Sequence, residues 1–256
     1  MMTSNDSAVG GYKVPVAELT VNQTKISYAA PNQAAYWRVS TFNTKEPETV
    51  KWIAGFQPGE VFVDIGANMG LYSLFAAVYS KAQVFAFEPE SQNYALLNQN
   101  IRLNNMAGSV VAWCCALTSK HSIDRLYMSH VDAARSGHEF GDEVNHELKP
   151  VESAFAQGCL GYALDDFVAA QSIPVPNHVK IDVDGFEHLV VEGALQTFAN
   201  TNLRSVLIEI SPHLSQHAQL IEIMCDIGFV FDPDQVERAR RKEGGNKDYA
   251  EYIFRR

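Results

Sequence analysis

Short apolar runs alternate with amphipathic segments through most of the chain. Residues 61–65 form an apolar run interrupted by one aspartate, and residues 71–79 are apolar on nearly every side, which predicts a buried strand followed by a buried helix. The same patterns predict strands at residues 84–87, 110–115, 179–183 and 205–210, and helices at residues 91–104, 186–198 and 214–227. Because strands that alternate with helices form parallel sheets covered on both faces, we expect an α/β, Rossmann-like fold.

The N-terminal part of the chain departs from this alternation. Weak strand patterns at residues 19–27 and 36–41 lie on either side of a turn-like Pro-Asn pair, and residues 1–11 are polar and are expected to be disordered. We therefore expect residues 1–45 to form an N-terminal extension with short strands.

The main domain is expected to span residues 46–256. Pro47, in the motif EPET, predicts the start of a short helix, because proline is tolerated at the first helical position. Near the C-terminus, residues 229–231 and 252–254 predict two last strands that pair as an antiparallel hairpin at the edge of the sheet.

One segment, residues 129–150, lacks periodic apolar positions and is rich in His, Asp, Glu and Gly. We expect its histidines, His130, His138 and His146, to face solvent or substrate and not to form a metal cluster. Long irregular segments inside compact domains are often lids or binding loops, so we predict that this segment covers the substrate side of a site. The alternative is a solvated insertion.

Composition narrows the class of protein. The chain has 256 residues, 46% of them hydrophobic, and a formal net charge of −10, which fits one acidic α/β domain with a small addition. Because an acidic surface repels phosphate groups, we expect neither nucleic acid nor an anionic membrane surface as a partner. No apolar run is long enough to cross a bilayer.

The four cysteines form no C-x-x-C pair, so neither a zinc nor a redox motif is predicted. We expect Cys114, Cys115, Cys159 and Cys225 to be free, buried thiols in a reducing cytoplasm. The N-terminus also lacks the basic and apolar regions of a signal peptide, which agrees with a cytoplasmic protein.

The strongest motif is VDIGANMGLYS at residues 63–73, where the first long strand gives way to a helix. Gly66 and Gly70 allow the backbone to turn sharply and to approach a ligand at the carboxyl end of the strand. Asn68 stands where a dinucleotide motif has its middle glycine, and Asp64 places a negative charge where it would repel a pyrophosphate. A ligand with an ammonium and a sulfonium group, such as S-adenosylmethionine, suits these residues better.

A second carboxylate, Glu88, follows the next predicted strand and lies 22 residues after Gly66. That spacing places it at the neighbouring strand end, where it can accept hydrogen bonds from both hydroxyl groups of a ribose. Pro89 ends the strand and restricts where the carboxylate points. Enzymes that bind NAD use an acidic residue in the same way, so only Asp64 and the broken glycine motif separate the two cofactors.

Acidic residues also gather in the motif KIDVDGFE at residues 180–187. Asp182 and Asp184 are predicted to share one face of a strand. Asp184 and Glu187 have the spacing of a capping box for the following helix, which we favour as their role. Asp182 has no capping role, and a charge in an apolar strand needs a partner, for which Lys180 is available.

The following strand carries Glu209 near its end, with His213 a few residues further on. Asp182, Glu209 and His213 are the candidates for removing a proton from a hydroxyl group. Two carboxylates and an imidazole also suit a divalent metal ion. We favour the metal-free version, because Lys180 gives Asp182 a charge partner and the spacing matches no common metal motif.

These motifs together resemble those of the FkbM family of S-adenosylmethionine-dependent methyltransferases. The resemblance runs from about Glu46 to Pro212 and includes EPET, the glycine motif, FEP at residues 87–89, ALDDF at residues 163–167 and KIDVDGFE. Asp184 is a departure, because the family more often has glutamate at that position.

The resemblance implies a class I methyltransferase fold with a mostly parallel, seven-stranded sheet that has one antiparallel strand. It also implies O-methylation of a hydroxyl group on a sugar or natural product. Carried over by position, the residues that bind S-adenosylmethionine are Asp64, Gly66, Asn68, Gly70 and Glu88. Two alternatives stay open: an NAD-dependent oxidoreductase on a similar sheet, and a cofactor-binding module without catalytic activity.

Overall fold

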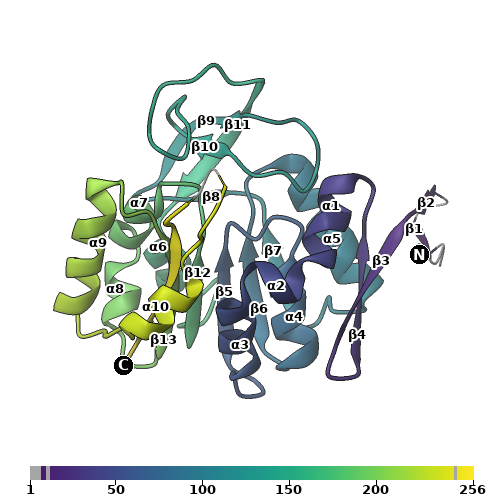
Figure 1. Ribbon diagram of the computed structural model, residues 1–256, viewed down its shortest axis with the longest axis horizontal. Helices are drawn as coiled ribbons and strands as arrows, with labels where there is room; N and C mark the ends of the chain where they lie inside the picture. Colours follow the sequence, from purple (N-terminus) through teal and green to yellow (C-terminus); the bar gives the residue numbers. More distant parts are fainter. Residues whose placement is uncertain (1–6, 10–11, 245–246) are drawn as a thin grey trace.

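The computed structural model describes residues 7–9, 12–244 and 247–256. In this part of the chain the main sheet has six strands, in the order β14-β13-β12-β5-β6-β7 (Figure 1). Five of them are parallel, and β14 runs antiparallel to β13. The strands are β5 (Val61–Ile65), β6 (Gln83–Phe87), β7 (Val110–Trp113), β12 (His178–Ile181), β13 (Ser205–Ile210) and β14 (Ala250–Arg255).

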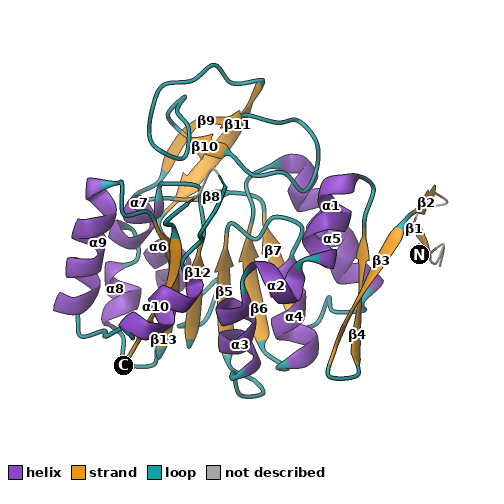
Figure 2. Ribbon diagram, viewed as in Figure 1, coloured by secondary structure: helices purple, strands orange, loops and turns teal. Residues whose placement is uncertain are grey.

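Helices cover both faces of this sheet, and each face has its own apolar core (Figure 2). Neighbouring residues of a strand point to opposite faces, so Phe62 belongs to one core and Val63 to the other. One face packs against α3 (Pro47–Ala54), α4 (Leu71–Tyr79) and α5 (Ser91–Leu103). The other packs against α6 (Leu164–Ala169), α7 (Glu187–Glu192), α8 (Leu195–Ala199) and α9 (Ser215–Asp226).

The structure confirms the predicted α/β fold. The sequence could predict it because strands that are buried on both faces read as apolar runs. The strand at residues 61–65, the helix at residues 71–79 and the strand at residues 205–210 agree with the structure to the residue. Helix α3 begins at Pro47, as predicted. The helix predicted at residues 186–198 is two short helices, since α7 ends before Gly193 and α8 starts after it.

The strand predicted at residues 19–27 is wrong, because it spans the turn of a hairpin. β3 (Val16–Val21) and β4 (Thr24–Ala29) pair antiparallel, and both turn residues have a positive φ, 47° at Asn22 and 69° at Gln23. The hairpin is tied to α5, since the side chains of Asn104 and Asn100 accept hydrogen bonds from the backbone of β4. The predicted boundary between the N-terminal extension and the main domain, near residue 45, stays a prediction.

The strand predicted at residues 36–41 is also wrong, because this segment lies in the helix α1 (Gln33–Ser40). The side chain of Asn32 accepts a hydrogen bond from the backbone N–H of Ala35 and caps the first turn. A short helix, α2 (Phe42–Lys45), follows. The capping asparagine was a signal for this helix that the prediction did not use.

The first residues of the chain were predicted to be disordered. That prediction is wrong for Ser7–Val9, which form β1 and pair antiparallel with β2 (Tyr12–Val14). The rest of the predicted disordered segment lies outside the described residues.

The seven strands implied by the family resemblance are not all formed. The predicted C-terminal hairpin is reduced to a single bridge between Val230 and Arg255. The chain leaves the sheet there because the side chain of Asp232 caps α10 (Pro233–Ala239), accepting a hydrogen bond from Asp234 N–H. In the described residues the sheet therefore has six strands, and β14 pairs with β13 instead.

A second sheet of four strands lies over the carboxyl ends of the main strands, at the top of Figure 1. Its order is β10-β9-β11-β8, and the sequence pattern did not predict it. The strands are β8 (Ala116–Leu117), β9 (Ser122–Met128), β10 (His138–Phe140) and β11 (Phe155–Tyr162). β10 lies inside the segment predicted to be irregular, residues 129–150, so that prediction is only partly right.

All four cysteines are free thiols, but their burial differs from the prediction. Cys115 and Cys159 are buried, whereas Cys114 and Cys225 are exposed. Across residues 7–9, 12–244 and 247–256, no helix is both long enough and apolar enough to cross a membrane.

Candidate active site

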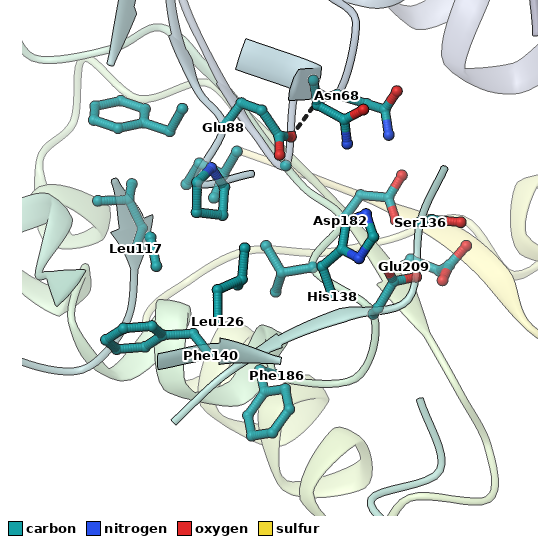
Figure 3. A pocket seen from close by; sticks show the side chains of 18 of the residues that line it. Asn68, Glu88, Leu117, Leu126, Ser136, His138, Phe140, Asp182, Phe186 and Glu209 are labelled. Carbon is teal, nitrogen blue, oxygen red and sulfur yellow. Dashed lines mark hydrogen bonds between the residues drawn. The ribbon is translucent and has the colours of Figure 1, made fainter. Parts of the chain in front are cut away.

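A hollow of about 920 Å³, partly open to solvent, lies between the carboxyl ends of the main strands and the second sheet. It brings together the turn after β5, the ends of β6, β12 and β13, and residues of β9 and β10 (Figure 3). Of the predicted site residues, five line this hollow: Gly66, Asn68, Glu88, Asp182 and Glu209. Ligands of open α/β sheets bind at this edge of the sheet.

Gly66 allows the turn after β5 to touch the turn after β12. Its φ is 77°, and a Cβ atom there would lie 1.9 Å from the carbonyl oxygen of Asp182. The backbone N–H groups of Gly66 and Ala67 both donate to the carbonyl oxygen of Phe87, each at 3.0 Å. Only glycine fits this position, so the glycine predicted from the motif has a physical cause.

Two predicted cofactor residues, Asp64 and Gly70, lie behind the turn and do not line the hollow. Asp64 is 1% exposed and accepts a hydrogen bond of 2.5 Å from the hydroxyl group of Ser73. Burial raises the pKa of the Asp64 carboxyl, although nearby Lys180 and the Ser73 hydrogen bond oppose the rise. Asp64 supports the turn from beneath, and its contact with a cofactor stays a prediction.

Glu88 lies at the end of β6 with its carboxylate against the glycine turn. One oxygen accepts a hydrogen bond from Asn68 N–H at 2.7 Å, the dashed line in Figure 3, and the other accepts from Glu90 N–H at 2.9 Å. Burial raises the pKa of Glu88 to about 7. The carboxylate therefore lies where hydroxyl groups of a ligand on the turn would meet it.

Asp182 has the charge partner that the sequence predicted. The ammonium group of Lys180, which is 2% exposed, lies 2.8 Å from a carboxylate oxygen of Asp182. Burial alone would raise the pKa of Asp182, but Lys180, with Lys45 and Arg241 nearby, holds it well below its usual range. Asp182 is therefore an ionised carboxylate that lines the hollow.

The capping box predicted for Asp184 and Glu187 is not formed. α7 begins after Phe186, which makes no side-chain capping bond, because positive φ values at Asp184 and Gly185 turn the chain before the helix starts. The carboxylate of Asp184 instead accepts a hydrogen bond of 2.7 Å from Gly137 N–H. It thereby ties the turn after β12 to the segment that was predicted to be a lid.

Glu187 has a different role from the predicted one. Its carboxylate accepts hydrogen bonds from the backbone N–H groups of Val183 and Gly185, at 2.9 and 3.1 Å. It also lies 3.0 Å from the buried imidazole of His217. Glu187 thus holds the turn after β12 from below.

Glu209 lines the hollow, but its carboxylate is already paired. It pairs with Arg241, whose guanidinium group also lies 3.1 Å from Glu251 and 3.7 Å from Glu46. Burial raises the pKa of Glu209 well above its usual range, nearby Asp182 raises it further, and Arg241 offsets this only in part. Because Arg241 occupies its carboxylate, Glu209 is a weaker candidate for the base than Asp182.

His213 is not brought to the hollow with the two carboxylates. Its side chain is 57% exposed and lies 3.9 Å from Asp248. The described residues contain no group of three or more His, Cys, Asp or Glu side chains placed to hold a metal ion.

One of the histidines predicted to face solvent or substrate lies in the hollow, and two residues that sequence reasoning missed lie there too. His138 lines the hollow near Asp182 and Glu209 in Figure 3. Both of its ring nitrogens are buried without a hydrogen-bond partner among the described residues, and burial lowers its pKa, so the imidazole is neutral. Arg38 and Lys45 also line the hollow. No sequence signal pointed to these two, because their segment read as a weak strand and a linker.

The segment between β9 and β10 is fastened over the glycine turn. The side-chain amide of Asn68 donates to the carbonyl oxygen of Arg135 at 2.7 Å. Ala134 donates its N–H to Asn93 and accepts from the guanidinium Nε of Arg38, both at 2.6 Å. We call residues 131–137 the strap, because three elements hold its backbone.

The strand order with an antiparallel β14, the glycine turn after β5 and the carboxylate after β6 define a class I methyltransferase fold of the Rossmann-like type. Residues 64–231 match the family model of the methyltransferase FkbM domain. The chain belongs to this FkbM family of S-adenosylmethionine-dependent methyltransferases, as the sequence motifs predicted.

Three similar proteins show the range of the likeness. The chain is 26% identical to the hexuronic acid methyltransferase AglP of Haloferax volcanii, over 68% of this chain and 65% of that protein. It is 26% identical to the 31-O-demethyl-FK506 methyltransferase FkbM of Streptomyces tacrolimicus, over 70% of this chain and 76% of that protein. The crystal structure of P. horikoshii TYW2 in complex with MeSAdo aligns with a TM-score of 0.47 and 15% identity, over 93% of this chain and 69% of that one.

Proposed function

We propose that this protein transfers a methyl group from S-adenosylmethionine to a hydroxyl oxygen of a sugar or natural product. One observation carries the proposal: the glycine turn and the ionised carboxylate of Asp182 line the same hollow and touch through the Asp182 backbone. A methyl donor on the turn would therefore lie beside a group that can accept a proton. The names of two relatives, a hexuronic acid methyltransferase and a 31-O-demethyl-FK506 methyltransferase, support this class of acceptor.

The residues present suit the methyl donor. Glu88 can accept hydrogen bonds from the two ribose hydroxyl groups in place of its present backbone partners. Beside it the hollow has apolar walls from Phe87, Leu117 and Leu126, which suit the flat face of an adenine ring. Asp64 leaves this part of the hollow open to the ligand, since it lies behind the glycine turn and does not line the hollow.

The reaction that fits this site is an in-line displacement. The acceptor oxygen forms a bond to the methyl carbon, the carbon–sulfur bond breaks with its electrons passing to sulfur, and the hydroxyl proton passes to a base. Asp182 is the base in this proposal, because Lys180 keeps it ionised, whereas Arg241 pairs with Glu209 and His213 lies elsewhere. Alignment of the reacting atoms supplies much of the acceleration, since it replaces an encounter in solution.

The acceptor side of the hollow is formed by the second sheet and the strap. Phe140 and His138 of β10 and Phe186 line this part of the hollow (Figure 3). Aromatic side chains suit the apolar face of a sugar ring or a natural product. The predicted lid, residues 129–150, thus contributes to the acceptor side in this proposal, with its strap hydrogen-bonded to Asn68, Asn93 and Arg38.

The affinity for S-adenosylhomocysteine should rise with pH around neutrality. Burial raises the pKa of Glu88 to about 7, so the carboxyl must lose a proton before it can accept two hydroxyl hydrogen bonds. From roughly pH 6 to pH 8 the dissociation constant should fall, by up to about tenfold for each pH unit below the pKa.

Glu88→Gln keeps the size of the side chain but removes the titration. At pH 8 it should bind S-adenosylhomocysteine more weakly than the wild type by about 1–3 kcal/mol, and its affinity should change less with pH. Calorimetry of both proteins over this pH range checks the prediction. The same affinity and the same pH dependence in both would remove Glu88 from the cofactor site.

Methyl transfer itself is tested with a panel of hydroxylated acceptors. The wild type is incubated with S-adenosylmethionine and hexuronic acids, neutral glycosides or polyketide alcohols, and the products are read by mass spectrometry. We expect at least one acceptor to gain one methyl group on oxygen while S-adenosylhomocysteine accumulates. Cofactor binding without transfer to any acceptor would favour the alternative of a non-catalytic module.

A further inference from the structure

Two basic side chains from the N-terminal segment line the hollow of this acidic protein. Arg38 lies in α1 and Lys45 at the end of α2. Both also line a smaller adjoining hollow, which they share with Gly66, Asn68 and Asp182. Two cations that converge on one end of a cofactor turn suit a ligand with a negative charge at that end.

Arg38 is held in place but keeps its main hydrogen-bonding capacity. Its Nε donates to the carbonyl oxygen of Ala134 at 2.6 Å, which orients the guanidinium plane. Among the described residues no carboxylate pairs with Arg38, and no other hydrogen bond of its side chain is formed. The two terminal amino groups are the part of a guanidinium that binds a carboxylate in a bidentate manner.

Lys45 can contribute a second set of donors. Its ammonium group lies 2.7 Å from Glu46, and its side chain is 33% exposed. An ammonium group has three donors, so a ligand can bind without displacing Glu46. Lys45 also lies near enough to Asp182 to lower the pKa of that carboxyl, which places it at the glycine turn.

The position of these cations matches the shape of the methyl donor. Glu88 lines the main hollow but not the smaller one, so the two groups mark opposite ends of the site. S-adenosylmethionine has ribose hydroxyl groups towards one end and a free amino acid at the other. With the ribose at Glu88, the amino acid extends across Gly66 towards α1 and α2.

We propose that Arg38 and Lys45 bind the carboxylate of the methionine moiety of S-adenosylmethionine, so that the N-terminal segment completes the cofactor site. The inference rests on the proposed function, since it takes S-adenosylmethionine as the ligand of the glycine turn. It extends that function to residues outside the region matched by the family model, residues 64–231. In this proposal the strap positions Arg38, because the carbonyl oxygen of Ala134 orients the Arg38 guanidinium.

Calorimetry with two ligands tests the inference without an acceptor. S-adenosylhomocysteine carries the carboxylate, whereas 5′-methylthioadenosine keeps the adenosine and the sulfur but has no amino acid. Arg38→Gln and Lys45→Gln should each weaken S-adenosylhomocysteine binding, Arg38→Gln by at least about tenfold, because a charge-assisted bidentate pair is lost. Binding of 5′-methylthioadenosine should change by less than about twofold, since it makes no such pair. Arg102→Gln, at an exposed position of α5, is the matched control and should bind both ligands as the wild type does.

Each other outcome has a distinct meaning. Unchanged S-adenosylhomocysteine binding in both variants would overturn the inference and would leave the basic pair to an acidic group of the acceptor. An equal loss for both ligands would also overturn it, because it would show that Arg38 acts only by holding the strap. A wild type that binds neither ligand would instead overturn the proposed function.

Discussion

Gly66→Ala should lower the free energy of unfolding by about 2–5 kcal/mol and abolish binding of S-adenosylhomocysteine. The new Cβ atom would lie 1.9 Å from the carbonyl oxygen of Asp182, and the backbone would keep a φ of 77° that alanine disfavours. To relieve the clash, the turns after β5 and β12 must move apart. The glycine turn after β5 would then lose its position beside Asp182.

Gly228→Ala separates the clash from the cost of a positive φ. Gly228 has a φ of 93° and no atom within 4 Å of an added Cβ, so its loss of stability should be only about 1–2 kcal/mol, with cofactor binding intact. Denaturant unfolding and calorimetry on both variants provide the comparison. Equal losses of stability, or tight ligand binding by Gly66→Ala, would show that the close contact of the two turns is unimportant.

Asp182→Asn should reduce methyl transfer by at least about tenfold, the lower end of what a general base contributes. Asparagine keeps the shape of the side chain but cannot accept the hydroxyl proton. Lys180 stays close to Asp64 and Glu46, so the fold should persist, and S-adenosylhomocysteine binding should change far less than turnover. Thermal unfolding and calorimetry check these two points.

Glu209→Gln is the matched comparison for Asp182→Asn. Glu209 lines the same hollow, but its carboxylate pairs with Arg241. Glutamine can still accept a hydrogen bond from that guanidinium, so turnover should fall much less. A larger loss of turnover in Glu209→Gln than in Asp182→Asn would indicate that Glu209, and not Asp182, is the base. Wild-type activity that is lost on chelation and restored by magnesium or manganese would contradict the metal-free version.

The elements around the glycine turn could be predicted because their sequence patterns lie within short stretches of the chain or follow a regular spacing. The strand Val61–Ile65 is buried on both faces and therefore reads as an apolar run with a single interruption, at Asp64. Glu88 follows from its spacing after Gly66, and the pairing of Lys180 with Asp182 joins residues two positions apart on one chain segment. The strand and the Lys180–Asp182 pair are thus determined by neighbours in sequence, and Glu88 by the spacing between two adjacent strand ends.

The site predictions that were wrong or missing concern contacts between segments that are distant in sequence. His213 was chosen because it follows β13, but the chain turns outward there and the imidazole that reaches Glu187 is that of His217 in α9. Arg38 reaches the hollow only because α1 packs beside the strap, and no local pattern records that contact. The second sheet was missed because β8 and β10 are short, and because β9 and β11 bury only two residues each and so lack a strong apolar pattern.

The central claim is that the turn from Gly66 to Gly70 binds S-adenosylmethionine and not a dinucleotide. Calorimetric titration of the wild-type protein with S-adenosylhomocysteine, and separately with NAD, tests it most directly. We predict one binding site per chain for S-adenosylhomocysteine and no detectable heat with NAD. Binding of NAD without binding of S-adenosylhomocysteine would contradict the claim and favour an oxidoreductase.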